Sequence, residues 1–529
     1  MKARLLGAVV GASALVVGSV GAHAGGLFIP GAGPQAQSRA GAFVAKADDT
    51  TAMFHNPAGF MKGTGTVVQI GVNLVNMSLE FSRHGVYESP IGQNLSYDGQ
   101  RYPTVSDNSK PAIGIGGFQA IPTIGVSTDF GLQKKGIPIR FGFSIMAPQA
   151  YPERNFDKGY QFEGDINEAP PPQRYDVVTQ EAATVLPSVA VAYQVNDKLD
   201  IGARFSAGFA ELKGSTYVWG IANYKEWIAR DGIFDVDVKD NFVPAFGFGL
   251  LYRPTTNLEL GFSYSSSVEV HAKGTGVGTL GSDLGFGPDM PDDVVPLEDF
   301  DGKPRCGGGG TREALPACVD FSIPQTVHVG ARYILRDGKG GEKADIEFDV
   351  KWENWADASD IFVAVDGKDE LLGTRLNESI IRHNLIDSFS FRVGGSYALP
   401  VGKNLLAIKA GVAYDTKSAV GSWNRLDIDS KPRVTLGTGI AFTFGKVRIE
   451  AGGGVVLEKD RTVSTSCSPT ITNEGCLGTG EETPREDREF PDPVQPLVDP
   501  LSQQIEKPFT SGEYKSGYVL LHFGVTTWF

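Results

Sequence analysis

Basic residues recur within apolar stretches of this sequence, each at a position that alternates with apolar side chains. They are Arg140, Arg204, Arg332, Arg392, Lys409, Arg433 and Arg448, and the acids Glu259, Glu347, Asp349 and Glu450 occupy similar positions. Cations grouped on one face could bind the carboxylate of a ligand, or they could pair with the acids as structural ladders. Pairing is favoured for any single residue, and Arg204 is kept as a candidate ligand contact.

Catalytic chemistry finds no support in the sequence. It lacks the GxSxG, HExxH and Walker A patterns, and its glycine runs stand in strand or loop contexts without a following helix. The acids Asp289, Asp292, Asp293, Glu298, Asp299 and Asp301 could bind calcium, although a solvated acidic loop is the favoured reading. We therefore predict that the chain is not an enzyme and needs no cofactor or metal.

Charge and cysteine usage restrict the partners and the compartment. The net charge of −14 makes nucleic acid an unsuitable partner. The four cysteines form two close pairs, Cys306 with Cys318 and Cys467 with Cys476, and neither pair has the CxxC spacing of a zinc or redox site. Two local disulfides in an oxidising compartment are the interpretation we favour.

The elements that must position these side chains show a period of two. Ile139, Phe141, Phe143 and Ile145 alternate with Arg140 and small residues, which is typical of strands facing lipid on one side and a wet lumen on the other. A mean hydropathy of −0.12 does not oppose this, because the two faces cancel in the average. Fourteen segments follow the pattern: 66–76, 119–130, 138–148, 185–195, 198–211, 241–252, 258–271, 325–334, 345–355, 389–399, 405–414, 433–444, 446–458 and 515–529.

The connections between these segments alternate in length. Long ones cover 77–118, 149–184, 212–240, 272–324, 356–388, 415–432 and 459–514, and short ones lie between them. This alternation predicts an all-β, antiparallel transmembrane barrel of about fourteen strands, with tight periplasmic turns and long external loops. Both cysteine pairs fall in long loops.

The two ends of the sequence agree with export to an outer membrane. Lys2 and Arg4 precede an uncharged apolar run, and Ala22-His23-Ala24 fits a signal-peptidase site, so residues 1–24 read as a cleaved signal peptide rather than a retained anchor. The last segment alternates apolar residues up to the terminal Phe529, which resembles the signal read by the barrel-assembly machinery. We expect a monomer in the outer membrane of a Gram-negative bacterium, in contact with its lipid and lipopolysaccharide.

Residues 25–65 lack strand alternation and are rich in Gly, Ala and small polar residues, as suits compact packing within an enclosure. Within them, the run from Ala47 to Phe60, with Asn56-Pro57-Ala58 after an Asp-Asp pair, closely resembles the N-terminal hatch of the FadL/TodX family. Trp352-Glu353-Asn354-Trp355 is similar to an aromatic pattern that the family carries on its ninth strand. We therefore divide the chain into a signal peptide (1–24), a hatch that plugs the lumen (25–65) and a barrel (66–529).

The resemblance implies passive outer-membrane transport of long-chain fatty acids or other hydrophobic compounds. The ligand would be captured on external loops, would pass to a lumenal pocket, and would leave sideways into the bilayer when the hatch rearranges. It assigns gating to Asn56, Pro57 and Ala58 and to the N-terminal Gly25, Leu27 and Phe28. Lys213 lies where the family tends to carry a basic ligand contact.

Two features of the residues bear on this mechanism. Pro148 ends the third segment, and because proline cannot donate to a ladder it either opens the wall or simply terminates the strand. Tyr217, Ile221, Tyr224 and Ile228 fall at helical spacing beside Trp219 and Trp227, which predicts a short helix that touches ligand or packs on other loops. The alternatives to such a transporter are a general diffusion porin and, less favoured, an outer-membrane hydrolase.

Overall fold

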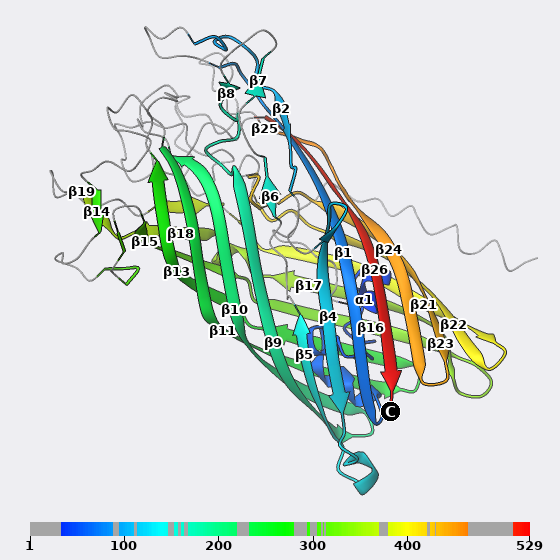
Figure 1. Cartoon of the computed structure of the whole chain (residues 1–529). Helices are drawn as coiled ribbons and strands as arrows, with labels where there is room; N and C mark the ends of the chain where they lie inside the picture. Colours follow the sequence, from blue (N-terminus) through cyan, green and yellow to red (C-terminus); the bar gives the residue numbers. More distant parts are fainter. Residues whose placement is uncertain are drawn as a thin grey trace, which may run out of the picture.

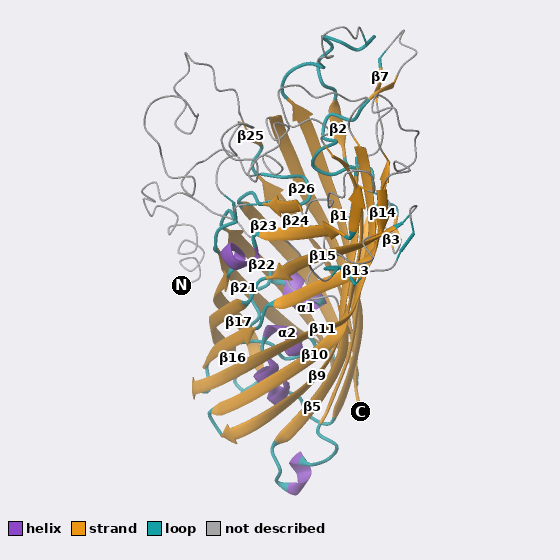
Figure 2. Cartoon of the chain, turned by 90° about the vertical axis from the view of Figure 1, so that its left-hand side faces the viewer, coloured by secondary structure: helices purple, strands orange, loops and turns teal. Residues whose placement is uncertain are grey.

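Fourteen antiparallel strands close into a barrel whose interior holds an N-terminal segment (Figures 1 and 2). The structure is a computed structural model. It describes residues 33–87, 95–109, 114–146, 153–156, 160–162, 168–218, 232–279, 294–296, 304–307, 310–311, 314–369, 379–383, 385–419, 424–428, 430–463 and 512–529. Among these residues no helix is long and apolar enough to cross a membrane.

In the closed ring, each barrel strand is hydrogen-bonded to the barrel strands that precede and follow it in the chain. Its members are β1 (Thr66–Arg83), β4 (Phe118–Thr128), β5 (Ile139–Met146), β9 (Thr179–Asn196), β10 (Leu199–Val218), β11 (Gly232–Thr255), β12 (Leu258–Ser265), β16 (Thr326–Arg336), β17 (Glu342–Glu353), β21 (Ser388–Val401), β22 (Asn404–Asp415), β23 (Arg433–Phe444), β24 (Val447–Glu458) and β26 (Gly512–Trp528). The last strand pairs with the first from Val67 opposite Trp528 to Arg83 opposite Gly512, so this seam leaves no free edge.

Alternation in the sequence matches the two faces of the wall. Phe143 and Ile145 are exposed on the outside of β5, whereas Arg140 near the start of the same strand is fully buried inside the barrel. The other lumenal cations and acids expected from the sequence also lie inside, Arg448 less deeply than the rest. The wall therefore presents apolar side chains to lipid and polar ones to the lumen.

Several strands extend beyond the segments that the sequence predicted. β10 and β11 continue to Val218 and back to Gly232, beyond the ends expected near residues 211 and 241. Tyr217, expected in a helix, is a strand residue, because its backbone pairs with that of Ile233 on β11. The other residues of that expected helix lie outside the described residues.

One side of the barrel is built in two tiers. The expected strand 258–271 breaks at Ser266-Ser267 into β12 and β13 (Val268–Thr279). Above β12, β16, β17 and β21, the upper tier runs β11–β13–β15–β18–β20, with β15 (Leu315–Ile323), β18 (Asp360–Val365) and β20 (Ser379–Arg382). The 3-10 turn η5 (Trp355–Ala358) joins the tiers between β17 and β18.

The remaining elements are short. They are the helices α1 (Pro34–Ser38), α2 (Ala52–His55), η1 (Pro57–Lys62) and η2 (Gln133–Lys135), and the strands β2 (Thr104–Ser106), β3 (Gly114–Ile115), β6 (Arg154–Asn155), β7 (Tyr160–Gln161), β8 (Glu168–Ala169), β14 (Val294–Pro296), β19 (Gly367–Asp369) and β25 (Arg461–Val463). A disulfide joins Cys306 to Cys318 on β15, whereas Cys467 and Cys476 lie outside the described residues.

Candidate functional site

Residues 33–65, which we call the hatch segment, lie inside the lower half of the barrel (Figure 2). Its first helix, α1, packs against β22, β23, β24 and β26, and η1 packs on the opposite wall against β9, β10 and β11. Most of its side chains are buried, including Phe43, Met53 and Phe60. The segment therefore spans the lumen from wall to wall.

Carboxylates of β17 hold the hatch segment by its backbone. Asp349 accepts hydrogen bonds from the backbone N–H groups of Phe43 (2.8 Å) and Val44 (3.1 Å). Glu347 accepts from the N–H of Ala45 (2.6 Å). These acids satisfy backbone groups that no strand pairs with, which is what burial of an irregular segment requires.

Arg39 adds an ionic anchor from the hatch segment to the same strand. Its guanidinium is fully buried and donates to Asp345 at 3.0 Å and Glu347 at 2.9 Å. Removal of one member of such a buried group leaves an uncompensated charge, which costs roughly 3–5 kcal/mol. Arg332 pairs with Asp345 and Glu259 beside it, and Lys409 pairs with Glu450, so these two cations belong to structural pairs.

Asn56 occupies the bend between α2 and η1. Its amide nitrogen donates to the carbonyl oxygens of Val44 (2.9 Å) and Leu250 on β11 (2.8 Å), and its amide oxygen accepts from the N–H of Ala58 (3.1 Å). Pro57 begins η1, where a missing N–H is tolerated. The Asn-Pro-Ala triplet therefore fixes a turn and ties it to the wall.

Glycines line the inside of the wall where the backbone or side chains of the hatch segment approach it. A Cβ atom at Gly394 would lie 2.7 Å from the carbonyl oxygen of Arg39, and one at Gly261 would lie 2.6 Å from that of Val44. Other strands repeat the arrangement, and we call the set the glycine belt. The belt comprises Gly71, Gly125, Gly142, Gly202, Gly249, Gly261, Gly330, Gly394, Gly411, Gly437, Gly439 and Gly524.

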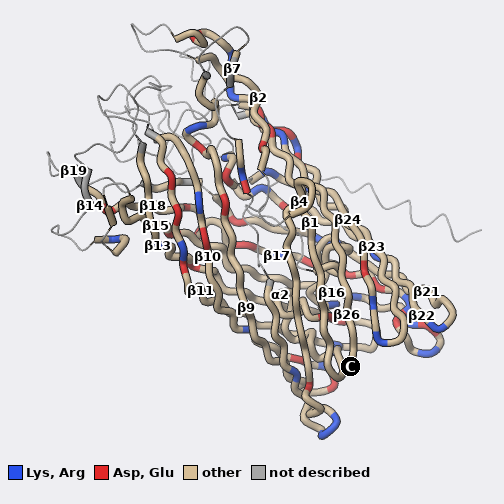
Figure 3. The backbone as a smooth tube through the Cα atoms, in the orientation of Figure 1, with Lys and Arg blue, Asp and Glu red and all other residues tan. Residues whose placement is uncertain are grey.

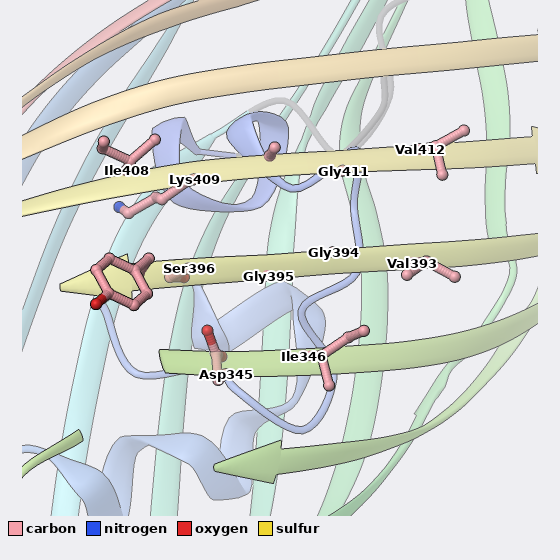
Figure 4. A pocket seen from close by; sticks show the side chains of 12 residues that line it. Asp345, Ile346, Val393, Gly394, Gly395, Ser396, Ile408, Lys409, Gly411 and Val412 are labelled. Carbon is pink, nitrogen blue, oxygen red and sulfur yellow. The ribbon is translucent and has the colours of Figure 1, made fainter. Parts of the chain in front are cut away.

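Figure 4 shows two belt members side by side, Gly394 on β21 and Gly411 on β22, with the ribbon of the hatch segment behind them. The thin wall leaves a hollow of about 520 Å³, framed on its outer side by exposed residues such as Ile346, Val393 and Val412. The belt was missed in the sequence, although glycine at inward positions of successive strands is a readable signal.

Above the hatch segment the lumen becomes apolar. A cluster of buried side chains begins at Leu186 on β9 and continues across the upper tier, and we call it the upper cluster. Its members are Leu186, Ala210, Val238, Val243, Ala245, Val268, Val270, Ala272, Ala317, Val319, Phe321, Ile323, Trp355, Ala358, Leu385, Ala419 and Ile428. An apolar cluster therefore lies above the plugged part of the lumen.

Between β4 and β9, the described residues leave a stretch without ladder pairing beside the upper cluster, and we call this stretch the interruption. β5 pairs with β9 only as far as Met146 opposite Leu186, and pairing with β9 resumes at Gln180 opposite Arg154. Among the described residues, 181–185 of β9 and 120–122 of β4 have no ladder partner across this interval. Pro148 and its neighbours 147–152 lie outside the described residues.

An external cap, residues 169–178 and 424–428, covers the upper mouth. The first segment reaches from β10, where the N–H of Tyr217 donates to the carbonyl of Arg174 (2.8 Å), to β1, where Arg83 donates to the carbonyl of Pro172 (3.1 Å). Asp176 then joins the two segments by accepting from Arg425 (2.6 Å). The cap thus crosses the mouth and is closed by a buried ion pair.

Asp427 extends the ion pair to a third segment. It accepts from Arg425 (3.3 Å), and its other oxygen lies 2.7 Å from Nε2 of His383. Burial alone would raise the pKa of Asp427, but the charges of His383 and Arg425 outweigh burial and hold this pKa well below its usual range. The carboxylate therefore stays charged inside the cap.

The structure places Lys213, for which the family resemblance suggested a ligand contact, outside the lumen. Lys213 lies on the outer face of β10, 45% exposed, and its ammonium is 3.3 Å from Glu211 and 3.5 Å from Asp237. Figure 3 shows further charged residues along the upper parts of β10, β11 and β13. The side chain continues the outward phase of Phe205 and Phe209 and cannot face the lumen.

The other candidates divide into two groups. Arg204 is buried and stacks on the ring of Phe54 in the hatch segment, 4.6 Å from its centre, with only weak hydrogen bonds to Met53 O and Ser265. Its contact with ligand stays a prediction. The candidates Trp219, Trp227, Gly25, Leu27 and Phe28 and the acidic loop residues from Asp289 to Asp301 lie outside the described residues.

Comparison with known families decides the classification. Residues 15–477 match the family model described as "Outer membrane protein transport protein (OMPP1/FadL/TodX)". The chain belongs to this family. Its place is accordingly the outer membrane, and its class is that of transport proteins. A search of curated proteins finds no match.

Solved structures of other FadL/TodX proteins share the fold at low sequence identity. A FadL homologue from Pseudomonas aeruginosa superposes with a TM-score of 0.65 at 16% identity, covering 96% of this chain and 100% of its own. The toluene transporter TodX of Pseudomonas putida gives 0.57 at 14% identity, covering 94% and 99%, and the toluene transporter TbuX of Ralstonia pickettii gives 0.56 at 15%, also covering 94% and 99%. At such identities the likeness establishes the barrel architecture alone.

Proposed function

We propose that this FadL/TodX family member carries hydrophobic small molecules passively across the outer membrane. The ligand is captured by the external loops, occupies the apolar upper lumen, and leaves sideways through the interrupted wall when the hatch rearranges. Fatty acids and monoaromatic hydrocarbons both fit this class, since relatives are toluene transporters and FadL homologues.

One observation carries the proposal: the stretch where the described residues leave the wall without ladder pairing adjoins the upper cluster. Leu186 belongs to the cluster and also ends the β5–β9 ladder, and Ile121 faces the lumen on the opposite edge of the interruption. A ligand that leaves there remains among apolar atoms. A route through water would instead cost about 0.8 kcal/mol for every CH₂ group exposed.

The hatch supports lateral rather than axial release. Its packing from wall to wall and the anchors at Arg39 and Asn56 oppose a route straight through the lower lumen. We propose that Asn56, Pro57 and Ala58 form the hinge of the gating movement, in which Gly25, Leu27 and Phe28 also take part. Arg204, stacked on Phe54, is placed to meet an anionic ligand group once the hatch has shifted.

A bulky label in the interruption tests the lateral route. Thr184 on β9 points into the lumen at the interruption, and Thr435 on β23 is also buried in the lumen but lies in a continuous ladder. We expect a Thr184→Cys variant labelled with a biotin maleimide to take up radiolabelled oleate or toluene at least about tenfold more slowly than unlabelled protein. The label blocks the exit with the lowest barrier, and any other route raises the barrier to release.

The labelled Thr435→Cys variant and labelled wild-type protein are the controls, and both are expected to keep their uptake. Equal losses in both labelled variants would contradict a lateral exit and favour axial passage. Steady ion conductance by the wild-type protein in planar bilayers would instead favour the diffusion-porin alternative, because a porin has no plug.

A further inference from the structure

The upper cluster contains a polar group that its surroundings do not satisfy. Trp355, only 1% exposed, is the largest fully buried side chain of the described residues, and its indole N–H has no hydrogen-bond partner among them. The hydroxyl of Ser418, adjacent in sequence to the cluster member Ala419, is also buried without a described partner. Buried tryptophan N–H groups usually find an acceptor, so each exception needs a physical reason.

The turn that carries Trp355 is firmly built. Asp387 accepts hydrogen bonds from the indole of Trp352 (3.0 Å) and from the backbone N–H of Ala356 (3.2 Å). It thereby holds the chain both before and after Trp355. The amide of Asn354 donates to Asp357, and its N–H donates to the carbonyl of Gln325 at the tier break. The fold thus fixes the orientation of η5 and provides acceptors for donors of Trp352, Asn354 and Ala356, whereas the indole N–H of Trp355 has none among the described residues.

We infer that Trp355 determines ligand specificity: its N–H binds an uncharged oxygen acceptor on a ligand held in the upper cluster. The inference rests on the proposed function and narrows its substrate class to hydrophobic molecules with a carbonyl, ester, ether or hydroxyl oxygen. An apolar pocket with one fixed donor discriminates in this way, because a ligand that lacks the acceptor leaves the donor unpaired. Pairing with the ligand supplies the partner that the described residues do not.

The Trp355→Phe variant tests this inference, since it removes the N–H and keeps an aromatic ring. Cells that produce each variant are given an equal mixture of 2-undecanone and undecane, and uptake of both is measured by gas chromatography. We expect the ketone-to-alkane ratio to fall about three- to tenfold in Trp355→Phe, the effect of one neutral hydrogen bond. Trp352→Phe, which also removes an indole N–H but one already donated to Asp387, is expected to keep the wild-type ratio.

An unchanged ratio in Trp355→Phe, or an equal loss of both compounds, overturns the inference, because ring volume alone would act on both. If wild-type protein takes up neither compound, the proposed function itself fails. If the Trp355→Phe variant does not assemble, a measurement on the wild-type protein tests the inference instead. Ultraviolet resonance Raman bands that report indole N–H hydrogen bonding are expected to change with 2-undecanone and not with undecane, and identical spectra with both compounds would overturn the inference.

Discussion

A Gly411→Val variant is expected to convert the sealed barrel into a steady ion conductor. A Cβ atom at this position would lie under 3 Å from the carbonyl oxygen and Cα of Arg39, so the hatch backbone and the new side chain cannot occupy the same space. The barrel ladders do not involve this side chain, and outer-membrane abundance should remain normal. Single-channel recordings in planar bilayers measure the result.

Ala410→Val is the matched control for this change. Ala410 is the preceding residue on the same strand, and its side chain is on the exposed outer face of the wall. The same added volume there is expected to leave the bilayer current at the wild-type level. A Gly411→Val barrel that remains silent would show that the hatch can shift without leaking, and would contradict the tight fit attributed to the glycine belt.

The second large effect is expected at the external cap. Arg425→Ala leaves Asp176 buried without its cation, which costs roughly 3–5 kcal/mol. Because each 1.4 kcal/mol changes an equilibrium tenfold, the cap should open at least about a hundredfold more often. Hydrogen exchange of peptides covering 173–178 and 424–428 measures this opening, while exchange in the β1–β26 seam should not change.

The control for Arg425 is Arg336→Ala, which removes an exposed arginine hydrogen-bonded to turn carbonyls at the opposite end of the barrel. Its effect on cap exchange is expected to be nil. Unaltered cap protection in Arg425→Ala would mean that the apolar contacts of Leu426 hold the cap without the ion pair.

Acidity should also open the cap. A carboxyl whose pKa is lowered on folding stabilises the folded state above its unfolded pKa, near 3.9 for aspartate, and this contribution is lost as the pH falls through the lowered value. For Asp427 the contribution is therefore complete at neutral pH and disappears only in strong acid. Protease resistance of the cap is expected to be constant between about pH 5 and 8 and to fall below about pH 4.

The barrel was predictable from the sequence because each face of a strand meets one environment. Arg140 and Phe143 have opposite positions in the alternation and lie on opposite sides of the wall. The same rule, continued beyond the predicted segment 198–211, gives Lys213 the outward phase of Phe209, in agreement with its exposure in the structure. By contrast, β11 has exposed residues at both Asn241 and Phe242 opposite the register shift, and alternation cannot anticipate such a bulge.

The site was less predictable, because it depends on contacts between distant segments. Asn56 was identified through the hatch motif, but its acceptor on β11 is a backbone carbonyl and leaves no mark in the sequence. Asp176 and Arg425 are 249 positions apart in irregular loops, where no periodicity indicates which residues turn inward. Trp355 was noted as part of a motif, and only its burial without an acceptor pointed to a role.

The glycine belt has a consequence for how the molecule is made. A plug that touches the wall on almost every strand cannot slide past side chains into a finished cylinder, and the hatch segment leads directly into β1, one half of the β1–β26 seam. Biogenesis should therefore wrap the wall around the plug, with the hatch segment in place before the β1–β26 seam closes. A barrel whose seam closes before residues 33–65 have docked in the lumen would remain a barrel without its plug.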